Sequence, residues 1–182
     1  MSEIEFVLIG LGILLSLAIA KLLEALFYGL TIGTSYWVQT TWALQRLLAA
    51  FTYFWTFRGA LDGALQMSVY DFFAILVSPA LMFMQSLALL SPSPHNVRDW
   101  EDQFLAARRQ FFLLHALIML GNAHAVLVLN SGIPYYGFAT QFLAGVVGFN
   151  TNDRRTHAAL AVLCLVVFAL GVAIPVVSVA AG

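Results

Sequence analysis

The chain has 182 residues, of which 62% are hydrophobic and 9% charged, and its formal net charge is −1. A soluble domain usually carries about 25% charged residues, so these charges are too few to cover a water-facing surface. The charge balance argues against nucleic acid as a partner, and the single cysteine, Cys164, rules out an intramolecular disulfide.

Long apolar runs predict an all-α, polytopic integral membrane bundle of about six transmembrane helices, with a single transmembrane domain over residues 1–182 and no soluble domain. The first apolar run resembles a signal peptide, but Glu3 and Glu5 without a basic residue favour a retained first helix. The expected helices are Ile4–Leu30, Ser35–Phe57, Val69–Leu90, Asp99 to about Asn130, Tyr135–Phe149 and Thr156–Ala181.

The fourth and fifth helices carry the most distinctive local signals. Asp99 is suited to cap the fourth helix, which should continue unbroken through Arg108 and Arg109. The fifth helix is short and glycine-rich, and Gly137, Gly145 and Gly148 predict close packing inside the bundle. Its length also leaves open a re-entrant segment that does not cross the membrane.

Arginines in the loops predict the orientation, because cytoplasmic loops are enriched in Lys and Arg. With six spans, loops 91–107 and 150–155 would be cytoplasmic and both termini would lie outside. A re-entrant fifth helix would move the C-terminus inside. The arginines on the predicted cytoplasmic side are Arg98, Arg108, Arg109, Arg154 and Arg155.

Ionisable residues within the predicted spans are the main functional candidates, because a charge at the bilayer centre costs about 2.5–3.5 kcal/mol on insertion scales. Arg46 lies near the middle of the second helix, and Glu24 lies at a similar predicted depth in the first. We therefore expect Arg46 to face the bundle interior and to pair with Glu24. Lys21 shares a helix face with Glu24, and His115 should lie in the same half of the membrane, so the candidate intramembrane site is Lys21, Glu24, Arg46 and His115.

Four further residues are secondary candidates. Gln39 and Tyr53 repeat with Arg46 at intervals of seven, so the three should line one protein-facing stripe. Asn122 shares a helix face with His115, and Asp71 opens the third helix, where it suits the first turn and could pair with Arg58. His124 should point away from His115 on the same helix.

No cofactor or metal is implied by the sequence. His115 and His157 together would supply two axial ligands for a haem, but their predicted depths differ and no other haem signature is present. Signatures of hydrolases, metalloproteases, nucleotide-binding enzymes and redox enzymes are also missing. The sequence therefore does not favour an enzyme, although membrane enzymes can lack such motifs.

Three classes of function stay open on these observations. A small transporter, channel or membrane sensor with a polar intramembrane site leads narrowly, because an ionisable group inside the membrane is by default a functional hypothesis. A non-catalytic structural or accessory subunit of a larger membrane complex is the alternative, and a membrane enzyme or pigment carrier comes third. The expected partners are the lipid bilayer and either further copies of the chain or other membrane proteins.

Overall fold

A computed structural model describes residues 3–31, 36–61, 68–90, 94–128 and 136–180, and within these ranges the chain forms six α-helices and no strand. A short 3-10 turn, η1 (Pro94–Asn96), precedes α4. The helices are α1 (Glu3–Thr31), α2 (Trp37–Leu61), α3 (Val69–Leu89), α4 (Trp100–Val128), α5 (Tyr136–Asn150) and α6 (Arg154–Ala180).

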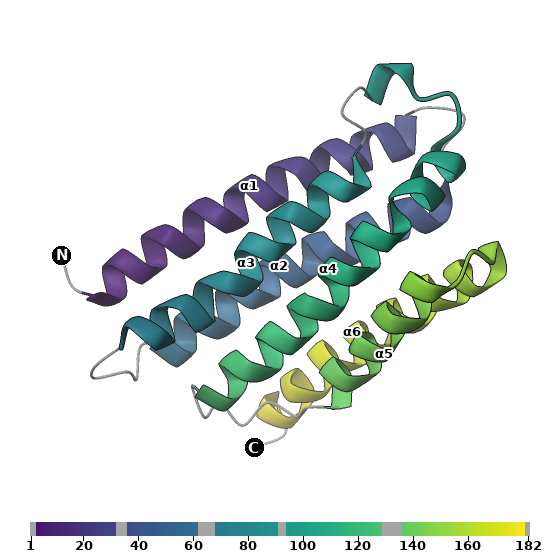
Figure 1. Ribbon diagram of the computed structural model, residues 1–182. Helices are drawn as coiled ribbons and strands as arrows, with labels where there is room; N and C mark the ends of the chain where they lie inside the picture. Colours follow the sequence, from purple (N-terminus) through teal and green to yellow (C-terminus); the bar gives the residue numbers. More distant parts are fainter. Residues whose placement is uncertain (1–2, 32–35, 62–67, 91–93, 129–135, 181–182) are drawn as a thin grey trace.

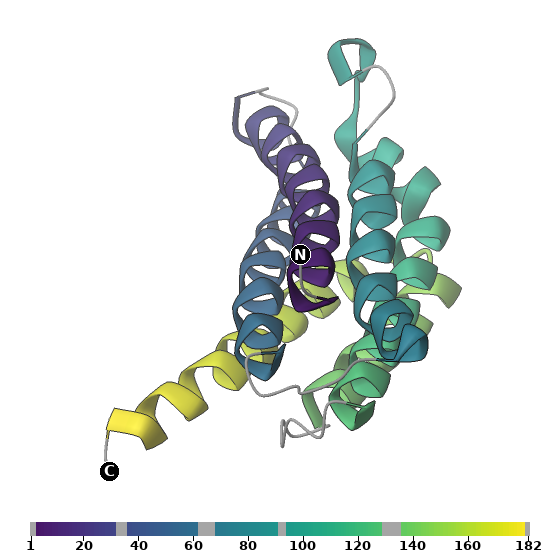
Figure 2. The same ribbon diagram turned by 90° about the vertical axis from the view of Figure 1, so that its left-hand side faces the viewer.

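The six helices run side by side in alternating directions (Figure 1). α1 packs against α2 and α3, α4 packs against α3 and α5, and α6 packs against α2 and α5, which closes a ring of helices. α2 also contacts α3 and α4, so it has neighbours on most of its sides. Toward its C-terminal end α6 diverges from the other helices (Figure 2).

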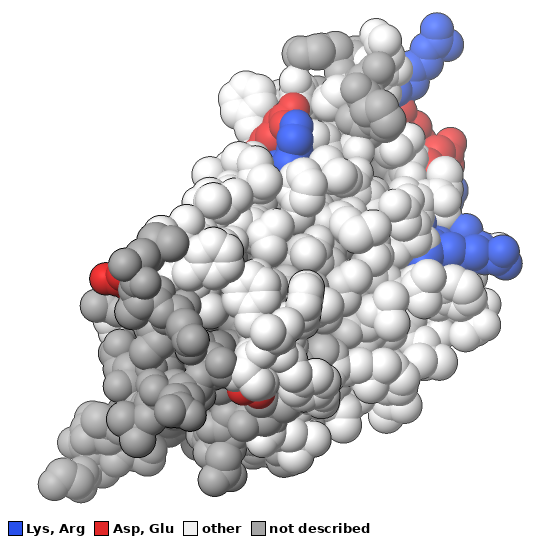
Figure 3. All heavy atoms as spheres, turned by 60° about the vertical axis from the view of Figure 1, so that its left-hand side comes forward, with Lys and Arg blue, Asp and Glu red and all other residues white. Residues whose placement is uncertain are grey.

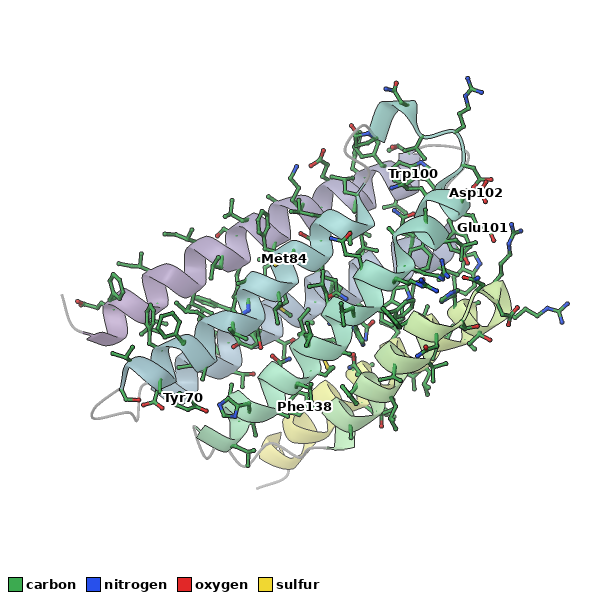
Figure 4. All side chains as sticks on the ribbon, viewed as in Figure 1. Tyr70, Met84, Trp100, Glu101, Asp102 and Phe138 are labelled. Atoms are coloured by element: carbon green, nitrogen blue, oxygen red, sulfur yellow. The ribbon has the colours of Figure 1, made fainter. Side chains whose placement is uncertain are left out.

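The two ends of the bundle differ in charge. α1, α3 and α5 finish at one end, where α2, α4 and α6 begin, and we call it the arginine end because it carries Arg98, Arg154 and Arg155. Figure 4 shows Trp100, Glu101 and Asp102 at this end, and Tyr70 and Phe138 at the opposite end. Seen from one side, charged side chains gather mainly at the arginine end, and an apolar surface covers the middle of the molecule (Figure 3).

That apolar surface consists of large side chains exposed along the outer faces of the helices. On α1, Phe6, Ile13 and Phe27 are each more than half exposed, and on α3 the same holds for Val69 and Phe73. Four helices, α1, α3, α4 and α6, contain apolar stretches long enough to cross a membrane. α2 carries more polar residues, and α5 has 15 residues.

Most predicted helix boundaries agree with the structure to within two residues, and their caps explain why. The Asp99 carboxylate accepts hydrogen bonds from the backbone N–H groups of Glu101 (2.8 Å) and Asp102 (3.3 Å), as expected of an N-cap. α4 then continues through Arg108 and Arg109, which confirms the unbroken fourth helix. Asp71 forms a capping box with Ser68 at the start of α3.

The predicted end of the second helix is wrong. The helix was expected to stop at Phe57, but α2 continues to Leu61. A single glycine, Gly59, costs only about 1 kcal/mol inside a helix, and no proline follows to stop it. The Arg58 side chain, suggested as a partner of Asp71, lies outside the described residues, as do the predicted turns around residues 32–34 and 131–134.

Polar contacts at the arginine end hold α4 against the start of α6. Arg154 forms an ion pair with Glu101 (Nε to Oε1, 2.8 Å), and Arg108 Nε donates to the carbonyl of Thr151 (3.0 Å). Asp153 caps α6 by accepting from the backbone N–H (2.9 Å) and hydroxyl (2.7 Å) of Thr156. These hydrogen bonds hold the pKa of the Asp153 carboxyl below its usual value.

α5 lies unusually close to α4, and two glycines make this possible. A Cβ atom on Gly145 would lie 3.0 Å from Cβ and 3.1 Å from the backbone nitrogen of Ala116, and one on Gly148 would lie 2.5 Å from the Phe112 ring. This confirms close packing at Gly145 and Gly148, but the prediction is wrong for Gly137, where a Cβ atom would have no neighbour within 4 Å. α5 is also not enclosed, because Leu143 on its outer face is 61% exposed. Gly145 and Gly148 therefore pack against α4 of the same chain.

We predict that Gly145→Ala separates α4 from α5 and destabilises the protein. Its new methyl group would meet the Ala116 backbone, which cannot move aside alone, so the cost should be about 1–3 kcal/mol. Gly137→Ala is the matched control on the same helix: a Cβ atom there would have no neighbouring atom within 4 Å, so stability should stay level or rise. Thermal unfolding of the purified variants measures both, and equal stability of the two would contradict the close approach.

Candidate functional site

The most unusual side chain in the structure is that of Arg46, which is 2% exposed. It lies about 13 Å from the start of α2, at a rise of 1.5 Å per residue, and therefore well inside the bundle. Its Nη2 donates to Gln141 Oε1 on α5 (3.0 Å), whereas Nε and Nη1 are buried without a hydrogen-bond partner. No carboxylate of the described residues lies within 4 Å of this guanidinium.

Two glutamines connect Arg46 to α5 and α6. Gln45 Nε2 donates both to Gln141 Oε1 (3.2 Å) and to the main-chain carbonyl of Cys164 on α6 (2.9 Å). Gln141 Oε1 therefore accepts from both side chains of α2, which fixes the orientation of both amides. Gln45 Oε1 is left buried and without a partner.

His115 on α4 completes this group. Its ring is fully buried, lies 5.1 Å from the Trp42 ring between centroids, and is close enough to Arg46 to interact with its charge. The ring interacts with the Gln141 main chain, although neither ring nitrogen forms a hydrogen bond of normal geometry. Trp42 Nε1 is buried without a partner. We call Gln45, Arg46, His115 and Gln141 the Arg46 cluster; it joins α2, α4 and α5 and contacts the backbone of α6.

Trp42, Gln45 and Arg46 share one face of α2 because they are three and four residues apart. The aromatic rings of Phe111 and Phe112 on α4 pack against Trp42 at 5.2 and 5.5 Å between centroids. These aromatic rings line the cluster on the side that faces the arginine end. Because rings and not water molecules lie there, the charge of Arg46 is screened less than it would be in water.

The predicted pairing of Glu24 with Arg46 is wrong. Glu24 Oε2 instead accepts from Lys21 Nζ (2.8 Å) on its own helix, and the two side chains are 36% and 38% exposed. The two residues match Arg46 in depth along the bundle, but they lie on the outer face of α1. Of the four candidate site residues, the structure brings Arg46 and His115 together and places Lys21 and Glu24 elsewhere.

The protein-facing stripe of α2 is confirmed, because Gln39, Arg46 and Tyr53 are each at most 5% exposed. Gln39 Nε2 donates to the Leu89 carbonyl (2.5 Å) and Tyr53 Oη donates to the Ile75 carbonyl (2.7 Å), both on α3. These two side chains therefore tie α2 to α3.

The remaining candidates on α4 and α3 also lie apart from Arg46. Asn122 is buried about 10 Å further along α4 than His115, with Oδ1 unpartnered. His124 is exposed and hydrogen-bonds to the Tyr70 hydroxyl, so it points away from His115 as expected. Asp71 caps α3 at the opposite end of the bundle.

His157, the other residue considered for haem, is fully buried in the aromatic cluster. It stacks on Phe112 at 5.2 Å and meets Phe104 edge-on at 5.8 Å. Among the described residues, no group of three or more His, Cys, Asp or Glu side chains could hold a metal ion.

Gln45 and Gln141 are the members that sequence reasoning missed. Both are neutral, so neither attracts attention by the cost of burying a charge. Gln45 had one usable signal, its position beside a buried arginine in the middle of a helix. Gln141 had a weaker one, since it is the only Gln of a short apolar helix whose glycines predict close packing.

No protein-family model matches the chain, and no curated protein or solved structure matches it either.

We predict that Gln141→Leu destabilises the protein by about 1.5–3 kcal/mol, because it removes the acceptor of a charged, buried donor. The double variant with Arg46→Met should lose less stability than the sum of the two single variants. Glu24→Gln should show no energetic coupling to Arg46→Met, because Glu24 pairs with Lys21 and not with Arg46. Thermal unfolding in lipid nanodiscs measures the single and double variants.

Gln85→Leu provides the matched control for this cycle. Gln85 is also fully buried, but its Nε2 donates to the neutral Phe111 carbonyl (3.2 Å). Its effect should therefore add to that of Arg46→Met. Simple additivity for Gln141→Leu, or strong coupling between Glu24 and Arg46, would contradict the assignment of Gln141 as the partner.

Proposed function

We propose that this chain is an integral membrane protein whose six helices all cross the bilayer. The exposed apolar side chains around the middle of the bundle and the four long apolar helices support this proposal. α2 and α5 run alongside the other helices (Figure 1), so a membrane that surrounds four of them also surrounds these two. At about 22 Å, α5 is shorter than a typical hydrocarbon core of about 30 Å, and local thinning of the bilayer would accommodate it.

The arginine end is then cytoplasmic and both termini lie outside. Arg98, Arg154 and Arg155 at this end follow the enrichment of basic residues in cytoplasmic loops. α5 runs antiparallel to both α4 and α6 (Figure 1), and this direction favours a spanning helix over a re-entrant segment.

We propose further that the protein is a small transporter, channel or membrane sensor that binds a solute at the Arg46 cluster. The observation that carries this proposal is a fully buried guanidinium without a carboxylate. A lysine in such a place can lose its proton, but arginine keeps its charge, and an uncompensated buried charge costs several kcal/mol. A solute that supplies the missing partner offsets that cost.

A structural or accessory subunit is the competing function. In that case the polar cluster only fixes how the helices pack, as interhelical hydrogen bonds do in many membrane bundles. Water would then have no path to the cluster, which separates the two functions experimentally. Self-association of the chain stays a prediction, and Gly145 and Gly148 do not support it, since α4 packs against both.

The orientation is tested by cysteine accessibility in a Cys164→Ala background. A cysteine at position 3 should react with a membrane-impermeant thiol reagent in intact cells, and one at position 97 only after permeabilisation. The reverse pattern would overturn the orientation. A C-terminal cysteine at position 182 that is protected in intact cells would show instead that α5 does not span.

Water access to the cluster is tested with the native thiol. Cys164 is buried, its carbonyl accepts from Gln45, and it is close enough to Arg46 to interact electrostatically. If a solute reaches this site, a small charged methanethiosulfonate should modify Cys164 in folded protein in liposomes.

A cysteine at Ala18, introduced with Cys164→Ala, is the control because Ala18 is equally buried in the apolar packing of α1. It should stay unmodified. If Cys164 reacts no faster than the Ala18→Cys control, the solute site is refuted and the structural function is favoured.

A further inference from the structure

The Arg46 cluster presents unsatisfied polar atoms of both kinds. Arg46 Nε and Nη1 and Trp42 Nε1 are buried donors without a partner, whereas Gln45 Oε1 is a buried acceptor without one. The His115 ring interacts with the Gln141 main chain and, when neutral, adds one acceptor nitrogen to the group. Buried atoms without a partner also occur elsewhere in the described residues, on Gln39, Ser78, Gln85, Trp100, Asn122 and His157. The Arg46 cluster differs from these because its unpartnered donors include those of a permanent charge, which points to a partner that is not a protein atom.

The charge of this partner follows from the residues around it. The cluster contains one permanent positive charge, Arg46, and no described carboxylate within 4 Å of it. The two glutamines are neutral. A single negative charge therefore neutralises the cluster, whereas a dianion would leave a buried excess charge and a cation would double the existing one.

The chemistry of the partner follows from the donors and acceptors. A guanidinium is a planar fork that binds two oxygens of a carboxylate-like group better than it binds a spherical ion. Gln45 Oε1 is an unpartnered acceptor, as are Gln39 Oε1 and Gln85 Oε1, but Gln45 alone of the three shares a hydrogen-bond acceptor with Arg46. A ligand with an O–H group would pair this oxygen, which acetate and chloride cannot do. The partner should thus combine an oxyanion with an O–H group.

The source of the partner is the aqueous phase. At about 13 Å from the start of α2, the guanidinium lies deeper than the headgroups of a surrounding bilayer. Gln141 and the Cys164 carbonyl lie at a similar distance from the arginine end of their helices. A small water-soluble ion is a better candidate at this depth than a phospholipid headgroup, which would have to carry its chains into the bundle.

We propose that the Arg46 cluster binds a small monoanionic oxyanion that carries its own hydroxyl donor, the class that includes bicarbonate and short 2-hydroxycarboxylates. The guanidinium binds the anionic oxygens, Gln45 Oε1 accepts from the hydroxyl, and Trp42 and His115 supply the remaining polar contacts. This inference rests on the solute site proposed above and specifies its ligand.

The test compares glycolate, acetate and chloride by isothermal titration calorimetry, with the purified chain in phosphatidylcholine nanodiscs at equal ionic strength. Glycolate should bind at least about ten-fold more tightly than acetate, the ratio expected for one extra buried hydrogen bond, and chloride should bind more weakly than either. Arg46→Met should abolish binding of all three anions.

Gln45→Met separates recognition of the hydroxyl from recognition of the charge. It should bind acetate and glycolate equally, because the acceptor for the hydroxyl is gone while Arg46 remains. Gln85→Met, which removes an equally buried glutamine outside the cluster, should keep the ten-fold preference. A preference that survives Gln45→Met, or wild-type protein that binds glycolate no better than acetate, would overturn the inference.

Protection of Cys164 gives a second measurement on the unaltered chain, which holds even if Gln45→Met does not fold. Glycolate should slow modification of Cys164 at concentrations where acetate has little effect. If Cys164 reacts with the reagent and glycolate neither binds nor protects it, the ligand class is wrong and the solute site stands. If Cys164 does not react and no anion binds, both proposals fail.

Discussion

The buried charge of Arg46 is the constraint on which the rest of the bundle depends. A guanidinium at this depth must be held by atoms of other helices, and its acceptor, Gln141, comes from the shortest helix. Gln141 reaches α2 only because α5 packs closely on α4, which in turn depends on Gly145 and Gly148. The hydrogen bond of Arg46 therefore depends on Gln141, and the position of Gln141 depends on the two glycines that let α5 approach α4.

Much of the architecture could be predicted because the apolar runs and their breaks are local properties of the sequence. The long apolar segments, the Asp99 cap and the seven-residue stripe through Arg46 each depend on residues close together in the chain. The boundary at Phe57 could not be predicted, because Gly59 can either end a helix or be carried inside one, and here α2 continues through it to Leu61.

The partner of Arg46 could not be predicted, because the sequence gives the depth of a residue along its helix but not which neighbouring helix its side chain faces. Glu24 has the appropriate depth, but the ring of helices turns its face of α1 outward, where Lys21 neutralises it. The order of helices around the ring is set by packing between segments far apart in sequence. A search guided by charge therefore found a carboxylate at the matching depth and overlooked a neutral amide on α5.

Other buried polar side chains in the same bundle show what purely structural polar contacts look like here. Gln39, Tyr53 and Gln85 are neutral, and each donates to a main-chain carbonyl of a neighbouring helix. Leaving the second atom of such an amide unpaired costs far less than burying a full charge. A neutral side chain at position 46 could also fix the packing of α2, α4 and α5, and it would avoid the desolvation penalty of a charge. Replacing buried charges by well-packed apolar groups is often neutral or stabilising. An arginine is a costly choice for packing alone, and its charge has a purpose if an anion is to be held between these helices.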